Sequence, residues 1–311
     1  MSRTWVKRMT LALVLCLAAA ALASCGRTQG VDRPSGKTAL TVGEYKVSEE
    51  EYNYYYVNHL KNNGIDAAEA EEDAEYDVSR NAAILDMAKE YGIELSPDER
   101  DAVKAEMEQL EETLTREVFE QQLEDFHMTR ELYLYLSQMS RLESLLREYV
   151  TDERSGVLKY DDSAVLDDIH KNFIAVKQIL IAIPDGADYQ TRFEALYSRA
   201  LEASLALKPD GSNFDEVAAE YGDDEQADPV YGRYFTHGMY PEEFEKAAKA
   251  LSVGEISGVI ETEVGYHIIM RIAQDEEYIN KNFEQLRYYF LTRCFNEMLD
   301  ERIDSMEVVR K

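Results

Sequence analysis

The chain has very few residues that could form a covalent framework. Its 311 residues include three cysteines, Cys16, Cys25 and Cys294. The first two lie in or next to a hydrophobic N-terminal segment, so Cys294 is alone in the body of the chain and a disulfide framework is excluded. Because Cys294 falls on an apolar helical stripe, we expect it to pack as a small hydrophobic side chain.

Basic residues are also scarce. Lysine and arginine together number 33 against 62 aspartates and glutamates, which gives a formal net charge of −29. Such a surface repels nucleic acid and anionic lipid headgroups, so neither is an expected partner. Two interpretations of the acidic excess stay open. It either keeps the protein soluble, or it favours basic clients or loosely bound divalent cations.

No hydrophobic run is long enough to cross a bilayer. The longest begins at Met9 and covers about 14 residues, whereas a membrane helix needs about 20. Basic residues precede the run and small residues follow it, which is typical of a secretory signal. Leu22-Ala23-Ser24-Cys25 resembles the bacterial lipobox, in which the cysteine is acylated and becomes the first residue. We therefore expect a signal peptide over 1–24 and lipid attachment at Cys25, as palmitate or a related acyl chain.

The segment after Cys25 is expected to be a flexible tether. Residues 25–37 are polar and contain glycine, proline and serine, a composition typical of linkers. Fully extended, about 12 such residues reach roughly 40 Å. The folded part would then stand clear of a membrane while held to it by lipid.

Residues 38–160 predict a helical domain. After a short strand or hairpin arm, Ser48 and Glu51 form a capping box that opens the first helix. Further apolar stripes at helical spacing continue to about residue 150. His59 and His127 are isolated, and we find no spacing of metal ligands or nucleophiles, so no metal or other cofactor is expected.

Residues 165–275 predict a small α+β domain. Its apolar strand-length runs are separated by turn signals and amphipathic helices. The expected order is strand 173–183, helices 189–207 and 214–221, strand 230–235, helix 241–251, and strands 258–262 and 266–272. The last segment, 280–311, predicts an apolar helix that must pack on something. We expect it to return to the N-terminal helices, which makes the α+β domain an insertion.

Several motifs of the α+β domain resemble the parvulin family of peptidyl-prolyl isomerases. They are Gly222-Asp-Asp, Gly232-Arg-Tyr-Phe-Thr-His-Gly238, Glu243-Phe-Glu-Lys-Ala-Ala248, Leu251-Ser-Val-Gly-Glu-Ile-Ser257 and Gly265-Tyr-His-Ile-Ile269. The resemblance covers about a third of the chain and implies a domain of βαααβαββ type. The flanking helices are similar in pattern and order to the chaperone part of extracytoplasmic foldases of the PrsA and SurA type.

The resemblance implies a set of catalytic residues. Parvulins hold two histidines in the floor of the site. The second matches His267, but Gln178 occupies the position of the first. The family's polar catalytic position, cysteine or aspartate, falls on Asp224. Its supporting hydroxyl group falls on Thr262. A glutamine both donates and accepts hydrogen bonds, so Gln178 could replace a neutral histidine in a chain to His267 and Thr262.

The resemblance also implies a pocket for the proline ring. The family uses a phenylalanine and a methionine there. Phe244 matches the phenylalanine, and Tyr240 aligns with the methionine, with Met239 beside it. Phe235 is the remaining aromatic side chain expected in this pocket.

These residues together imply a membrane-anchored foldase outside the cell membrane. It would isomerise X–Pro bonds in unfolded or partly folded exported proteins and chaperone them. The resemblance favours the outer face of a Gram-positive-type membrane, and a homodimer is left open. The alternative hypothesis is a weak or inactive parvulin-like holdase that only binds unfolded clients, because Gln178 replaces the first histidine.

Overall fold

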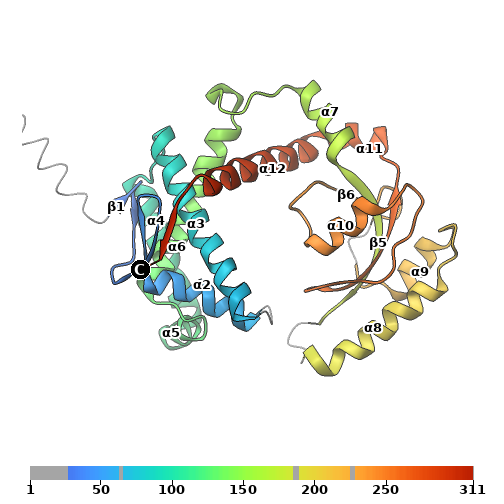
Figure 1. Cartoon of the computed structure of the whole chain (residues 1–311), viewed down its shortest axis with the longest axis horizontal. Coiled ribbons are helices and arrows are strands. Elements are labelled where there is room, and N and C mark those ends of the chain that lie inside the picture. The colour runs from blue at the N-terminus through green and yellow to red at the C-terminus, as the bar shows by residue number, and fades with distance from the viewer. Residues whose placement is uncertain (1–26, 63–65, 185–188, 225–227, 311) are drawn as a thin grey trace, which may run out of the picture. The chain divides into compact units, whose positions relative to one another are not determined.

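The computed structural model describes residues 27–62, 66–184, 189–224 and 228–310. The chain divides into two compact units (Figure 1). Unit 1 contains Met1–Ser155 and Glu297–Lys311, and unit 2 contains Gly156–Asn296. The expected signal peptide and Cys25 lie outside the described residues. None of the described helices combines the length and the apolar character needed to cross a membrane.

Unit 1 combines helices with two small antiparallel sheets. A hairpin, β1–β2, precedes a three-stranded sheet of order β4-β3-β9. The strands are β1 (Arg27–Thr28), β2 (Val31–Asp32), β3 (Thr38–Val42), β4 (Tyr45–Ser48) and β9 (Val308–Arg310). The helices are α2 (Glu49–Asn62), α3 (Ala67–Tyr91), α4 (Pro97–Leu114), α5 (Arg116–Asp125), α6 (Arg130–Thr151) and the short 3-10 helix η1 (Glu153–Ser155). The sequence did not predict β9, which lies where we expected the last helix to end.

Local capping explains where the helices of unit 1 begin. Ser96 and Glu99 form a capping box at the start of α4, and Thr129 accepts a hydrogen bond from a backbone N–H in the first turn of α6. Asp66 caps α3. This helix therefore includes the acidic stretch 67–75.

Part of the expected flexible tether is folded, because residues 27–32 form the β1–β2 hairpin. Val31 is completely buried, and the backbone N–H of Asp32 donates to Gln138 Oε1 at 2.7 Å. Gly30 lies so close to Leu95 that a Cβ atom would be 2.4 Å from its carbonyl oxygen. The prediction of a linker over 25–37 is therefore wrong for this hairpin, because a polar composition did not reveal its few specific contacts.

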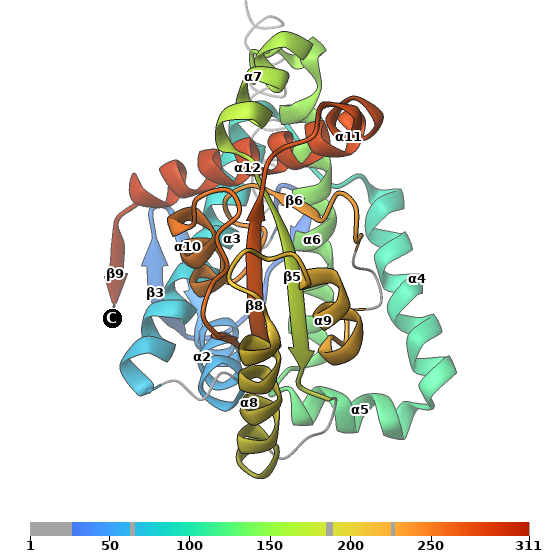
Figure 2. The same cartoon turned by 90° about the vertical axis from the view of Figure 1, so that its right-hand side faces the viewer.

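Unit 2 is built around a four-stranded antiparallel sheet of order β6-β5-β8-β7 (Figure 2). The strands are β5 (Ile174–Ala182), β6 (Arg233–Phe235), β7 (Ile260–Thr262) and β8 (Gly265–Ile272). The helices are α7 (Asp162–Asn172), α8 (Tyr189–Ala206), α9 (Phe214–Tyr221), α10 (Glu242–Ala250), α11 (Glu276–Lys281) and α12 (Phe283–Asp304). The α+β class is confirmed. In the described residues, two helices rather than three lie between β5 and β6, so the order is βααβαββ.

The two faces of this sheet pack against different helices. Ile179 and Ile181 face one way, into a core with α8 and α9. Val176 faces the other way, into a core that includes Phe244 of α10. Because side chains alternate along a strand, Gln178 lies on the same face as Val176. In β8, His267 pairs with Leu180, which places the imidazole on this face as well.

Helix α12 contributes to both units. Its Leu286 and Phe290 join a core with Phe173 in unit 2, whereas Asp300 accepts a hydrogen bond from Tyr76 in unit 1 at 2.8 Å. We expected this helix to pack on the N-terminal helices. Only the part from Glu297 belongs to unit 1. The apolar stripe of the first part instead completes unit 2.

Candidate functional site

Three aromatic side chains form an apolar cluster on the α10 face of the sheet. Phe244 is fully buried and stacks on Tyr240, with ring centres 4.6 Å apart and an interplanar angle of 20°. Phe235 of β6 lies 5.6 Å from Phe244 and 5.0 Å from Tyr240. Met239 packs against the same cluster and is only partly buried. These are the four residues predicted from the sequence to bind substrate, and the fold brings them together.

His267 forms one wall of the cluster. Its ring meets Phe244 edge to face at 5.2 Å, and its Nε2 lies 2.8 Å from Thr262 Oγ1. The Thr262 hydroxyl group is directed to the Gly265 carbonyl oxygen at 3.3 Å, so we assign Nε2 as the donor to Thr262. Burial lowers the pKa of His267 to about 4, against the opposing charge of Asp224. The imidazole is therefore neutral near pH 7.

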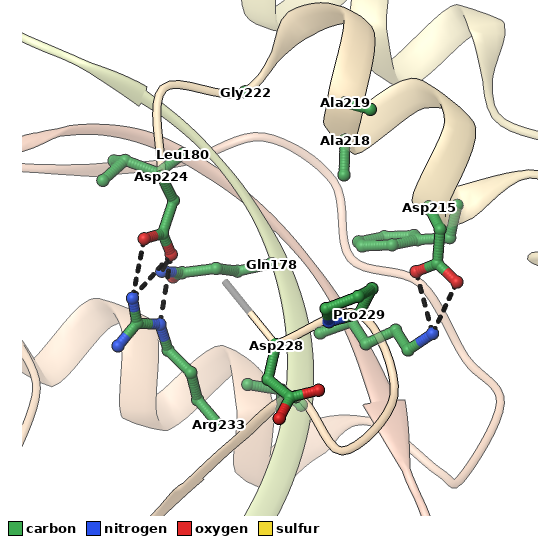
Figure 3. Close-up of a pocket in the computed structure, with 14 residues that line it drawn as sticks. Gln178, Leu180, Asp215, Ala218, Ala219, Gly222, Asp224, Asp228, Pro229 and Arg233 are labelled. Atoms are coloured by element: carbon green, nitrogen blue, oxygen red, sulfur yellow. Dashed lines mark hydrogen bonds and ion pairs between the residues drawn. The ribbon is translucent and has the colours of Figure 1, made fainter. Parts of the chain in front are cut away.

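A charged and polar cluster is formed by Gln178, Asp224 and Arg233 (Figure 3). Gln178 Nε2 donates to Asp224 Oδ2 at 2.6 Å, and the Arg233 guanidinium group binds both Asp224 oxygens at 2.7 Å. Asp224 has only 9% of its side chain exposed. A buried carboxylate needs such a partner. The positive charge of Arg233 also acts on Tyr240, opposing the rise of its pKa on burial, which connects the two clusters electrostatically.

The predicted chain from Gln178 to His267 is not formed. Gln178 gives its amide N–H to Asp224, while Gln178 Oε1 and His267 Nδ1 are buried without a hydrogen-bond partner in the described structure. The His267–Thr262 part of the chain is present. Sequence reasoning missed Arg233, which binds the same Asp224 carboxylate that accepts the Gln178 amide N–H. No spacing signal identified this arginine in advance.

Glu245 is a second residue that sequence reasoning missed. Its side chain is 3% exposed, and its Oε1 accepts the backbone N–H groups of Met239 and Tyr240 at 3.0 and 3.2 Å. Its Oε2 lies 2.8 Å from His237 Nδ1. Although burial opposes the charge, these partners lower the pKa of Glu245 overall. The carboxylate therefore positions the loop that carries two of the pocket residues. The sequence signal available for Glu245 was its position directly after Phe244, a core residue.

Comparison with known proteins identifies the family of this part of unit 2. Residues 179–273 match the model of the rotamase family, the PPIC-type PPIASE domain. This segment is a parvulin-type domain. The match covers the aromatic cluster, Asp224 and the His267–Thr262 pair, and it begins one residue after Gln178.

Relatives that are similar to this chain are named foldase proteins. The chain is 31% identical over 179 residues to the foldase protein PrsA of Caldanaerobacter subterraneus, which is 53% of this chain and 50% of the relative. It is 29% identical over 114 residues to PrsA of Bacillus subtilis, 36% of this chain and 37% of the relative. The chain thus spans about half the length, or less, of these relatives.

A solved structure of PrsA from Streptococcus pneumoniae is also similar to this chain. The two share 18% sequence identity, the match covers 84% of this chain and 91% of that one, and the TM-score is 0.37.

Proposed function

We propose that the chain is a peptidyl-prolyl cis-trans isomerase that acts on X–Pro bonds of partly folded exported proteins. The observation that carries the proposal is the neutral, buried imidazole of His267 against the aromatic cluster of Phe244, Tyr240 and Phe235. A prolyl ring is apolar and can pack against such a cluster. The parvulin-type domain and the PrsA relatives support the same activity.

The chemistry needs no covalent bond to break. Rotation about an X–Pro bond has an uncatalysed barrier of about 20 kcal/mol, and catalysis requires tighter binding of the twisted amide than of either planar form. Twisting removes the amide resonance, so the prolyl nitrogen gains a lone pair and the carbonyl group becomes a weaker acceptor. Phe244 and Tyr240 hold the ring away from water. The neighbouring Asp224–Arg233 pair sets the electrostatic field at the carbonyl group.

A protease-coupled prolyl-peptide assay tests this activity. The protein should accelerate cis-to-trans conversion above the rate in buffer, and Phe244→Ala should reduce the gain. Because Gln178 replaces the family's first histidine, Gln178→His should increase the rate if the pocket is otherwise competent. A wild-type rate equal to that in buffer would remove the enzymatic proposal.

A second candidate function is a holdase that binds clients without isomerising them. The observation that favours it is the amide group of Gln178, which is held by Asp224 and makes no hydrogen bond to His267. If the protein is a holdase, then wild type, Phe244→Ala and His267→Ala should all suppress the aggregation of an unfolded client equally well. An isomerase that depends on this site would lose its catalytic rate in both variants.

We further propose that lipid attached to Cys25 anchors the protein to the outer face of the cell membrane. The leader and the lipobox-like sequence support this location. Because β1 begins at Arg27, the anchor would hold unit 1 close to the headgroups instead of at the end of a long tether. Membrane fractionation of wild type and Cys25→Ser tests the anchor. The oligomeric state, including a homodimer, is tested by light scattering of the protein in detergent.

A further inference from the structure

A pocket adjoins the polar cluster of unit 2 (Figure 3). It has a volume of about 200 Å³ and lies among β5, α9 and the segment 228–233. Its lining includes the apolar side chains of Leu180, Phe214 and Ala218. None of the aromatic residues proposed to hold proline lines it. Gln178, Asp224 and Arg233 line it and also belong to the polar cluster, so these three side chains connect it to the proposed active site.

The charged groups of this pocket differ in what they bind. Asp215 pairs with Lys177 at 2.7 Å, and Asp224 pairs with Arg233 at 2.7 Å. Asp228 instead accepts the backbone N–H groups of Val230 and Tyr231 through Oδ1, at 2.8 and 3.0 Å. Within the described residues, no cation lies within ion-pair distance of Asp228. These backbone hydrogen bonds, together with the more distant positive charges of Lys281 and Lys177, lower its pKa, so it stays ionised near pH 7.

The pocket has a second acceptor in need of a donor. Gln178 is 8% exposed, and its Oε1 has no hydrogen-bond partner in the described structure. A buried polar atom of this kind favours a ligand that can satisfy it. Asp228 and Gln178 Oε1 are both acceptors, while the rest of the lining is apolar or already paired. A ligand with an apolar stem and a cationic, hydrogen-bond-donating head matches this combination.

We propose that this pocket binds a lysine or arginine side chain at the client residue that precedes the proline. The inference rests on the proposed isomerase function, which places the prolyl ring on Phe244 and the preceding carbonyl group beside Asp224. The residue that owns this carbonyl group then extends toward Asp228. Its methylene groups lie on Phe214 and Ala218, and its charge meets Asp228. The excess of acidic residues in the chain, 62 against 33 basic ones, attracts such clients over a longer range.

Peptides of the form Ala-X-Pro-Phe test this pocket. X is lysine, norleucine or glutamate, and norleucine has the lysine stem without its ammonium group. Both the dissociation constant, from the anisotropy of a labelled peptide, and the isomerisation rate are measured on the full chain at low salt. The lysine peptide should bind roughly three to five times more tightly than the norleucine peptide, which is the scale of an exposed ion pair. The glutamate peptide should bind most weakly.

Two matched variants locate the effect. Asp228→Asn removes the charge but keeps an oxygen that can accept the Val230 and Tyr231 N–H groups, so it should abolish the preference for lysine. Asp210→Asn is the control, because Asp210 is exposed and accepts the Ser212 N–H at 3.1 Å in the same manner. This control should keep the preference. Equal binding of lysine and norleucine peptides, or a preference that persists in Asp228→Asn, would overturn the proposal.

The outcomes separate this pocket from the proposed activity. If peptides bind with the lysine preference but are not isomerised, the pocket stands and the enzymatic proposal fails. If they are isomerised without a preference, the activity stands and the pocket proposal fails. If no peptide binds, both are overturned.

Discussion

Acidification should destabilise unit 2 through His267. The side chain is 2% exposed, and burial lowers its pKa to about 4 from an ordinary value of 6.5. Below pH 6.5 the unfolded chain binds a proton at this histidine, whereas the folded chain does not until the pH approaches 4. The unfolded state therefore gains protons first, and stability falls as the pH is lowered through this window.

The size of the effect follows from the two pKa values. With 6.5 in the unfolded state and about 4 in the folded state, the loss is close to zero at pH 7, about 2 kcal/mol at pH 5 and about 3 kcal/mol at pH 4. The loss levels off below pH 4, where both states are protonated. Many carboxylates also titrate in this range, so a reference protein that lacks only this histidine is needed.

Urea unfolding of wild type and His267→Gln between pH 7 and pH 4 isolates the contribution. The only tryptophan is Trp5, in the expected leader, so tyrosine circular dichroism is the suitable signal for unfolding. Wild type should lose about 3 kcal/mol more than the variant between these pH values. If the stability difference between the two proteins is the same at every pH, the imidazole is not held neutral by burial and the reasoning is refuted.

Three further variants test packing and positioning. Phe244→Ala removes a fully buried ring and should cost about 3–5 kcal/mol of unit 2 stability in thermal or urea unfolding; a loss below about 1 kcal/mol would contradict the described core. Glu245→Ala should increase the amide hydrogen exchange rates of Met239 and Tyr240, whose N–H groups Glu245 accepts, by roughly tenfold. The control Lys249→Ala removes a cation 3.5 Å from the same carboxylate and should leave both amides protected. Gly30→Ala should destabilise unit 1 by more than about 1 kcal/mol, because its φ is +77° and a Cβ would meet the Leu95 carbonyl oxygen at 2.4 Å; an unchanged melting temperature would show that the hairpin is not docked.

Much of the architecture could be predicted from local patterns. The Ser48 and Glu51 pair marked the start of α2, where the Glu51 N–H donates to Ser48 Oγ at 3.1 Å, and the apolar run from Phe173 marked β5. These signals depend on neighbours in sequence, so they can be read without the fold. The hairpin at Val31 could not be predicted in this way. Its stability comes from contacts with Leu95 and Gln138, which lie far away in the sequence.

The candidate site, too, could be predicted from the sequence only in part. Phe244 and His267 lie in motifs that identify the family, and the fold places their rings 5.2 Å apart. The partner of Gln178 was predicted incorrectly: its amide N–H donates to Asp224, the carboxylate that Arg233 also binds. Asp224 and Arg233 lie 46 and 55 positions from Gln178 in the sequence, so sequence spacing does not reveal this cluster.

The central claim is that the aromatic cluster of unit 2 binds a prolyl ring while the preceding amide rotates. Exchange NMR spectroscopy of a prolyl peptide with a catalytic amount of the protein measures this directly. We expect cross-peaks between the cis and trans resonances of the peptide with wild type, and much weaker ones with Phe244→Ala. A cis–trans exchange rate that is the same with wild type, with Phe244→Ala and without protein would contradict the claim.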